Sequence, residues 1–267
     1  MMRAAFVAEY RKLVSTRMWW LLLLVMLVYM AFIAAVLGWA LTQTGGNGGT
    51  APSTMSTAQI VRTIYTVPVS NGYVFPLIVG ALVVTAEYRH KTLTPTLLAD
   101  PSRNRLVVAK LGMGALIGVV FGVAGIVVST GAGAAVLALL GKPTALEAAS
   151  TWRMLGLAIV ALACWALIGV AVGTLITNQV AAVIVLIAFA QFLEPVLRLV
   201  LSRPTWGRHI AEYFPGAAGE AITGGNALTG NGVQTLSHWW AGLLVMLGYV
   251  VVLALAGRLT TLRRDVA

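Results

Sequence analysis

The chain has 267 residues, of which 59% are hydrophobic and only 10% are charged, and its mean hydropathy is +0.90. Soluble domains carry about 25% charged residues, so this composition excludes a soluble enzyme, a disordered scaffold and a secreted domain. The single cysteine, Cys164, lies in an apolar run and excludes an intrachain disulfide and a cysteine-based metal cluster. The net charge of +10 raises the question of which membrane face carries the basic residues.

Six apolar runs are long enough to cross a bilayer, which takes about 17–25 residues per helix. They predict an all-α integral membrane protein with a single transmembrane domain over residues 1–267 and spans at about 18–41, 67–86, 106–130, 155–176, 180–200 and 239–257. The run 106–140 exceeds a bilayer, so we expect the third span to end near Thr130, where Gly131–Gly133 loosens the helix. The first run is longer than the core of a cleaved signal peptide, about 7–15 residues, and predicts an uncleaved span.

The basic residues are distributed unevenly over the two sets of loops. Twelve Lys and Arg residues fall before the first span, between the second span and residue 110, or after the last span, whereas six fall in the outer loops. Cytoplasmic loops carry the excess of Lys and Arg, so both termini are expected in the cytoplasm. The cytoplasmic turn 177–179 is short enough to force the fourth and fifth spans to be antiparallel neighbours.

Residues 3–17 predict an interfacial helix before the first span. At helical spacing Phe6, Tyr10 and Leu13 fall on one arc, while Arg11 and Lys12 fall elsewhere. Such a helix places its apolar side in the acyl boundary and its basic side toward anionic headgroups. The alternative is a basic flank that only sets the topology.

The cytoplasmic segment 87–105 predicts a short helix that binds a partner. Thr94 is a plausible N-cap, Pro95 fits the first helical position, and Pro101 stops the helix. Apolar side chains on such a loop, flanked by charges of both signs, favour a docking surface for a cytoplasmic partner. The alternative is that they lie on the bilayer or under the bundle. These apolar residues are Leu93, Leu97 and Leu98.

The outer loops and the glycines add two further expectations. The loop 194–238 predicts short helices that partly re-enter the outer leaflet, and residues 57–65 predict a short surface helix. Glycines at helical spacing permit close helix contact in lipid and predict packing seams on the third and fourth spans at Gly114, Gly118, Gly122, Gly169 and Gly173.

The sequence contains few residues that could act in catalysis, metal binding or ion coupling. It has no P-loop and no H-E-x-x-H motif, and its three histidines are dispersed over loops, so we expect no catalytic residue and no metal ligand. Proton- and ion-coupled carriers need an ionisable or unwound polar site near the midplane. No acidic residue falls in the middle of a predicted span, which disfavours a self-powered carrier. The polar pathway candidates are neutral: Asn71, Ser129, Thr130, Thr174 and Gln191.

Six spans, no motor and a cytoplasmic docking helix together resemble the permease subunit of bacterial type-2 ABC transporters of the export class. The resemblance lies in Ala8-Glu9-Tyr10-Arg11-Lys12-Leu13 of the interfacial helix and in Glu87-Tyr88-Arg89-His90-Lys91-Thr92-Leu93, which leads through Pro101 to Lys110. It extends to Phe214-Pro215-Gly216-Ala217 before the last span. In that family the first inner loop holds the coupling helix that sits in a cleft of a separate ATPase subunit, and the outer segment forms re-entrant helices near the exit.

The resemblance implies the partners and a role for each segment. A cytoplasmic ATPase would carry ATP and Mg²⁺, so this chain would need no cofactor. A second permease subunit, in a homodimer or heterodimer, would complete the pathway in the bacterial cytoplasmic membrane, with lipids but no nucleic acid as further partners. Phe6, Tyr10 and Leu13 would brace the coupling segment. Within that segment Glu87 and Arg89 would make polar contacts with the ATPase, and the leucines would make apolar contacts with it. The candidate coupling residues are Glu87, Arg89, Leu93, Pro95, Leu97, Leu98 and Asp100.

Two other classes of protein fit parts of the pattern. A motor-free carrier or channel would transport solute without a partner. A membrane-embedded enzyme would need convergent polar residues at one depth, which the sequence does not offer, and a structural subunit would keep the docking helix but lack a pathway. The uniformly apolar spans suit a lipophilic or amphipathic cargo, as in multidrug or lipid efflux.

Overall fold

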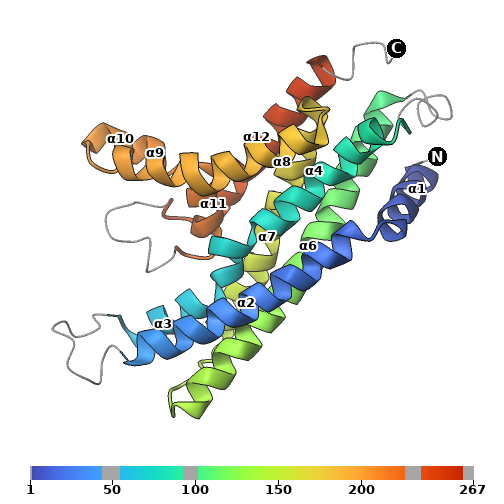
Figure 1. The fold of residues 1–267 in the computed structure, drawn as a ribbon. Coiled ribbons are helices and arrows are strands. Elements are labelled where there is room, and N and C mark those ends of the chain that lie inside the picture. Colours follow the sequence, from blue (N-terminus) through green and yellow to red (C-terminus); the bar gives the residue numbers. More distant parts are fainter. Residues whose placement is uncertain (1, 44–54, 93–101, 226–235, 261–267) are drawn as a thin grey trace.

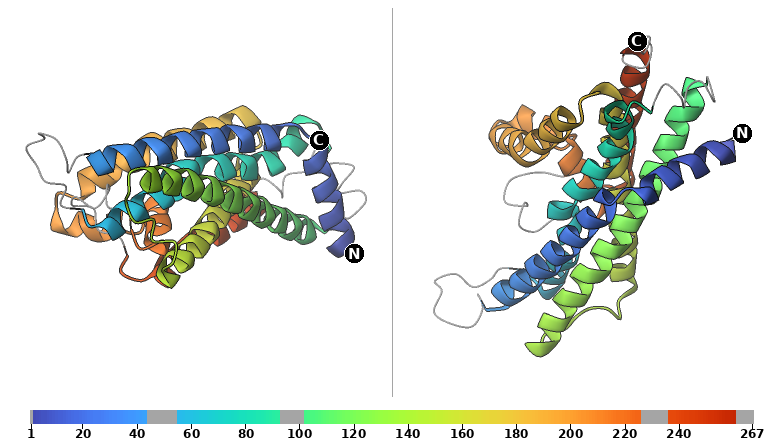
Figure 2. Two further views of the ribbon diagram at one scale, coloured as in Figure 1. Left: turned by 90° about the horizontal axis from the view of Figure 1, so that it is seen from below. Right: turned by 45° about the vertical axis from the view of Figure 1, so that its right-hand side comes forward.

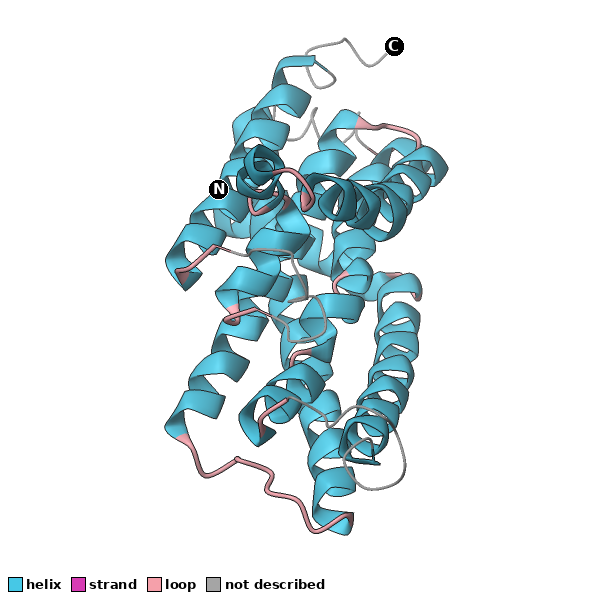
Figure 3. Ribbon diagram, turned by 90° about the vertical axis from the view of Figure 1, so that its left-hand side faces the viewer, coloured by secondary structure: helices cyan, strands magenta, loops and turns pink. Residues whose placement is uncertain are grey.

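The computed structural model describes residues 2–43, 55–92, 102–225 and 236–260. Within these ranges the regular structure is helical, with no strand (Figure 3). Six helical segments are long and apolar enough to cross a membrane: Met18–Thr42, Thr57–Arg89, Asn104–Leu139, Ala149–Leu175, Gln179–Leu201 and Trp239–Thr260. They confirm the predicted all-α architecture with six spans (Figure 1).

The second span is longer than the sequence indicated, because the short helix expected at residues 57–65 continues into it. α3 (Thr57–Tyr65), the π-helix η1 (Pro68–Gly72) and α4 (Val74–Arg89) follow one another along this span. Ser56 and Gln59 start α3 with a capping box. The apolar face of α3 is buried, and the Tyr65 hydroxyl donates to the Thr144 carbonyl at 2.7 Å. α3 is therefore part of the bundle.

The third span, α6 (Arg103–Leu139), is one helix of 37 residues, whereas the sequence predicted an end near Thr130. Gly133 does not loosen it. A Cβ there would overlap the Ile64 side chain, so this glycine lets α3 approach α6. The helix ends at Leu139, and Gly141 closes the turn after it, since its φ of +65° lets the Lys142 N–H donate to the Leu137 carbonyl at 2.8 Å.

A tight turn joins the fourth and fifth spans. α7 (Ala149–Leu175) leads into α8 (Gln179–Ile187), whose first N–H groups at Val180 and Ala181 donate to the Asn178 side chain. The fifth span then continues through a second π-helix, η2 (Ala188–Leu193), into α9 (Glu194–Leu201).

The fifth span ends in one short helix, and two more short helices follow it. α9 and α10 (Thr205–Ala211) extend away from the other helices in Figure 1, while α11 (Pro215–Ile222) turns back onto α12 (Trp239–Thr260) and α7. A Cβ on Gly242 of α12 would overlap the Ala218 carbonyl of α11, so the two backbones lie in close contact.

α7 is the central helix, and glycines set its distance from α4 and α6. A Cβ on Gly169 of α7 would overlap the Leu77 carbonyl of α4, and one on Gly118 of α6 would lie 2.5 Å from the Ala163 Cα. Backbone contact of this kind is how helices associate in lipid, where the hydrophobic effect does not drive them together. The predicted glycine seams thus lie at helix contacts, together with Gly80 of α4, which the sequence analysis missed.

Four elements meet at one end of the bundle. α1 (Met2–Ser15) precedes α2 (Met18–Gln43) and lies across α6 near the start of that helix (Figure 2). The last turn of α4 and the turn before α8 lie at the same end, where the Arg89 guanidinium donates to the Gln179 side chain at 3.4 Å. We call this end of the bundle the α1 end.

Two glycine substitutions on α7 test the close contact with α4. We expect Gly169→Ala to lower the free energy of unfolding by about 1–3 kcal/mol, because the new methyl group overlaps the Leu77 carbonyl. Gly156→Ala is the control, since nothing lies within 4 Å of that position, and it should be neutral or stabilising by up to about 1 kcal/mol. Denaturation of both variants in detergent micelles measures the difference. Equal stabilities would contradict the contact.

Candidate functional site: a buried ion cluster at the α1 end

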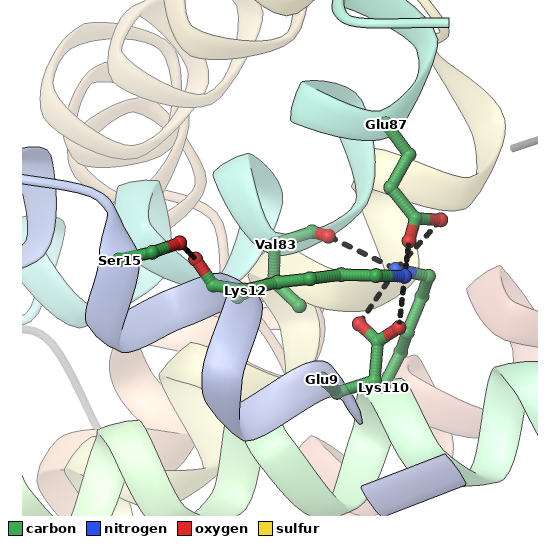
Figure 4. Close-up of polar contacts among 6 residues, drawn as sticks. All are labelled: Glu9, Lys12, Ser15, Val83, Glu87 and Lys110. Atoms are coloured by element: carbon green, nitrogen blue, oxygen red, sulfur yellow. Dashed lines mark hydrogen bonds and ion pairs between the residues drawn. The ribbon is translucent and has the colours of Figure 1, made fainter. Parts of the chain in front are cut away.

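Four charged side chains from three helices meet at the α1 end: Glu9 and Lys12 of α1, Glu87 of α4 and Lys110 of α6 (Figure 4). The Lys12 ammonium lies 2.8 Å from the Glu9 carboxylate and 2.5 Å from the Glu87 carboxylate. The Lys110 ammonium lies 3.0 Å from Glu9 and 2.9 Å from Glu87. Each cation therefore contacts both anions, and the four side chains form a closed ring of alternating charge, which we call the ion cluster.

Local sequence explains why these side chains converge. Glu9 and Lys12 are three residues apart, so they share one face of α1. Apolar contacts hold that helix in place, because Leu13 packs against the core cluster around Met113 and Phe6 contacts α6 next to Gly112. The two remaining members stand near the ends of α4 and α6 that flank segment 90–102. The ion cluster thus joins α1 to both helices from which this segment emerges.

The ion cluster is neutral and largely removed from solvent. Glu9, Glu87 and Lys110 are 5%, 4% and 2% exposed, and only the Lys12 side chain keeps substantial exposure, at 38%. The Lys110 ammonium, which has three donors, also donates to the Val83 carbonyl at 3.1 Å. A buried ion pair gives little net stability relative to apolar packing, but removing one partner costs about 3–5 kcal/mol because a bare charge stays buried.

Electrostatics favours the charged forms of both α1 residues. Burial alone would raise the pKa of Glu9, but the attraction of Lys110 and the hydrogen bonds from Lys12 and Lys110 outweigh it and hold the pKa below the ordinary 4.5. Burial alone would lower the pKa of Lys12, but its hydrogen bonds to Glu87 and Glu9 hold the pKa above the ordinary 10.5. Glu9 and Lys12 are therefore both charged near neutral pH.

The structure corrects two expectations about charged residues. Glu87 was expected to make a polar contact with a partner protein, but its carboxylate is 4% exposed and occupied by two lysines of the same chain. Lys12 was expected to face lipid headgroups with the rest of the polar side of α1, whereas its ammonium reaches inward to Glu87. Helical periodicity predicts that polar residues face outward. It contains no information on the charged residues that other helices bring near, so it cannot predict a buried ion pair.

Other residues of the predicted coupling and interfacial segments are distributed as follows. Arg89 is exposed at the α1 end. On α1, Arg11 and Tyr10 are exposed, Phe6 is 36% exposed beside α6, and Leu13 is half-buried. The remaining members of the coupling segment lie outside the described residues: Leu93, Pro95, Leu97, Leu98 and Asp100.

The five pathway candidates do not form one site. Ser129 is buried and donates to the Tyr65 carbonyl at 3.1 Å, and Thr174 donates to the Ala171 carbonyl at 2.6 Å, so both satisfy helix backbone. The Thr130 hydroxyl is buried without a hydrogen-bond partner in the described part of the chain. Asn71 of η1 and Gln191 of η2 are exposed at the two π-helical segments.

Glu9 and Lys110 were not among the predicted site residues. The available signal was the position of Lys110, a single ionisable residue inside a long apolar run, because such residues in spans pair with other charges. Among the described residues no group of three or more His, Cys, Asp or Glu could hold a metal ion. The ion cluster joins α1, α4 and α6.

Removal of Lys110 tests the energetic role of the ion cluster. We expect Lys110→Met to lower the free energy of unfolding by about 3–5 kcal/mol, because Glu9 and Glu87 then share only Lys12. The double variant Lys110→Met/Glu87→Gln should regain part of this loss, since it removes the unpaired carboxylate. Lys142→Met, at an exposed position, is the control. Denaturation in micelles measures all three, and an unaffected Lys110→Met would exclude the proposed role.

The shifted pKa values of Glu9 and Lys12 predict a plateau of stability. Because the pKa of Glu9 is lowered, its contribution is complete above about pH 4.5 and is lost as the pH falls through its folded pKa. The contribution of Lys12 is complete below about pH 10.5 and is lost above it. Thermal unfolding of the unmodified protein and of Glu9→Gln should differ by a constant amount between pH 6 and 9 and converge in acid. A step near pH 7 would contradict this ionisation scheme.

Comparison with known proteins adds the family. The family model of the ABC-2 family transporter protein matches residues 5–193, more than half of the chain, and this range includes all four members of the ion cluster. A comparison with curated proteins gives no match. The chain is therefore a multi-pass membrane protein that belongs to the ABC-2 transporter family.

Proposed function

We propose that this protein is the permease subunit of an ATP-driven exporter and that a separate ATPase moves it through segment 87–101. The observation that carries the proposal is the ion cluster, which ties α1, α4 and α6 together at the base of this segment. A passive loop would not need both of its flanking helices fixed to a third helix. A lever needs such a base, because force applied to a loose segment is lost in local bending.

The positive charge of the loops supports a cytoplasmic position for the α1 end. Twelve of the 18 Lys and Arg residues fall in the loops and termini assigned to this side. Exposed Arg11 and Arg89 lie there, and Arg89 contacts the turn at Gln179. In this arrangement Arg89 and the leucines of segment 93–98 contact the ATPase, and Glu87 positions them from inside the protein.

Transport follows from the connection between the segment and the spans. Closure of two ATPase subunits on ATP and Mg²⁺ displaces the segment, and the ion cluster makes α1, α4 and α6 move with it. α4 and α6 both pack on α7 through glycine contacts, so their displacement changes the packing of the pathway and shifts it between inward and outward access. A second permease subunit completes the pathway in the bacterial cytoplasmic membrane.

A motor-free carrier is the second candidate, and one observation favours it. Glu194, which falls where the predicted fifth span 180–200 overlaps the predicted outer loop 194–238, lies within the fifth span Gln179–Leu201 and is 2% exposed. A buried carboxylate in a span is the kind of group that ion-coupled carriers use. Transport into liposomes by the purified chain alone, without an ATPase, would favour this candidate and reject the proposal.

Charge placed on the coupling segment tests the proposal directly. We expect Leu97→Asp/Leu98→Asp to reduce the amount of ATPase that co-purifies from native membranes about tenfold or more, because burying a carboxylate in an apolar contact costs well over 1.4 kcal/mol. Leu139→Asp is the matched control, since Leu139 is 87% exposed at the far end of α6. Both variants should unfold at the temperature of the unmodified protein. Undiminished co-purification would reject the assignment of segment 87–101.

A further inference from the structure

Two spans contain π-helical segments, and a buried hydrogen bond joins the residue that follows one of them to the other. η1 in the second span is followed by Tyr73, and η2 in the fifth span is followed by Glu194. The Tyr73 hydroxyl donates to the Ala190 carbonyl inside η2 at 2.8 Å, and this bond is buried. π-helical turns inside α-helices occur frequently at functional sites, and substrate sites of membrane transporters form where spans are interrupted. The bond from Tyr73 to η2 therefore links the interrupted parts of the second and fifth spans, where a binding site is expected.

An aromatic pair lies beside this contact. The Tyr73 ring stacks on Trp165 of α7 with 4.4 Å between ring centroids, and Trp165 is 2% exposed. A Cβ on Gly219 of α11 would lie 3.0 Å from the Trp165 indole nitrogen, so α11 closes over this ring. The indole N–H has no acceptor among the described residues. Four elements thus surround the aromatic pair, and the indole N–H of Trp165 is a buried donor that no described residue accepts from.

Three buried charged residues stand next to it. Arg198 is bound to Glu220 of α11, with its two terminal nitrogens 3.0 and 3.5 Å from the carboxylate oxygens. Glu194 Oε1 accepts a hydrogen bond from the Gly216 N–H at 2.6 Å, whereas Glu194 Oε2 has no hydrogen-bond partner in the described ranges. Glu194, Arg198 and Glu220 are 2%, 9% and 7% exposed.

The charges of these residues do not balance. Arg198 and Glu220 neutralise each other, and Glu194 accepts hydrogen bonds from backbone N–H groups at Gly216 and Ala217. The three residues therefore carry one more carboxylate than cation. A carboxylate buried without a counter-charge is strongly disfavoured, above all in a membrane span. Aromatic faces attract cations. An anion and an aromatic pair at one place are therefore complementary to a positively charged organic group.

We propose that Glu194, Tyr73 and Trp165 form a cargo site for the cationic group of a lipophilic or amphipathic organic cation. This inference rests on the proposed transport function and adds the class of cargo. Glu194 supplies the counter-charge and the aromatic pair the apolar contact, while the Arg198–Glu220 pair and the Glu194–Gly216 bond hold α9 and α11 closed around the site. Asn71 and Gln191, which are exposed on η1 and η2, give polar groups to the same two segments.

Two ions of the same shape and opposite charge test the site. The complex is purified with its ATPase from native membranes, reconstituted in lipid nanodiscs and titrated with tetraphenylphosphonium or tetraphenylborate. We expect saturable binding of the cation, and Glu194→Gln should weaken it about tenfold or more, which corresponds to about 1.4 kcal/mol. Glutamine still accepts the Gly216 N–H, so α11 stays docked. Binding of tetraphenylborate should not weaken in the variant.

Two controls keep the result specific. Glu212→Gln changes a partly exposed carboxylate that lies between α10 and α11 and should leave cation binding unchanged. In the unmodified complex, labelling of Glu194 by a hydrophobic carbodiimide, read by peptide mass spectrometry, should be suppressed by tetraphenylphosphonium and not by tetraphenylborate. This second readout needs no variant, so it decides the matter if Glu194→Gln fails to fold.

Several outcomes would overturn the inference. They are the absence of saturable cation binding, equal binding by Glu194→Gln, equal protection by both ions, or carbodiimide labelling that responds to pH alone, which would make Glu194 a proton site. The ATPase content of each preparation separates this result from the proposed function. A complex that retains its ATPase but does not bind the cation rejects only the cargo site, whereas a preparation without ATPase rejects the transporter assignment.

Discussion

The Lys110 ammonium lies where water does not reach it, and acceptors from two other helices replace the lost hydration. Two of them are carboxylates on α1 and α4, and the third is the Val83 carbonyl one turn before Glu87. Because a buried ammonium cannot lose any of these partners cheaply, the positions of α1, α4 and α6 depend on one another. The arrangement of the α1 end, and with it the placement of the segment that α4 and α6 flank, follows from this single requirement.

The apolar runs were sufficient to predict the class of fold and the number of spans, because membrane thickness fixes the length of an apolar helix. They were not sufficient to predict where helices join. α3 reads as a separate amphipathic helix, since its polar residues interrupt the hydropathy, yet its apolar face packs on α6 and it continues into η1. The extra length of α6 has the same cause. Its second half packs on α3, and this contact cannot be inferred from Gly131–Gly133 alone.

The candidate site was predicted only in part, for a similar reason. The sequence pointed to the segment after Glu87 and to α1 as one functional unit, and in the structure Lys12 of α1 contacts Glu87 at the start of that segment. The pairing of Glu87 with two lysines of the same chain was not predicted, because a charged residue beside a loop looks solvated until its partners are known. Lys110 is 23 positions away in the chain, and Glu9 is 78 positions away, so no local pattern connects them with Glu87. Buried charge clusters are properties of the tertiary structure.

α4 gives the two charged regions a mechanical connection. Glu87 stands in its last turn, and Tyr73, which stacks on Trp165, immediately precedes its first residue. A helix of 16 residues is about 24 Å long and nearly rigid, so a displacement at the ion cluster reaches η1 with little loss. η1 is π-helical and not α-helical, which makes it the place where the second span can change its hydrogen bonding. Movement of α4 along the glycine contacts of α7 would therefore alter the contact between Tyr73 and η2 first, before it disturbs the packing of the remaining spans.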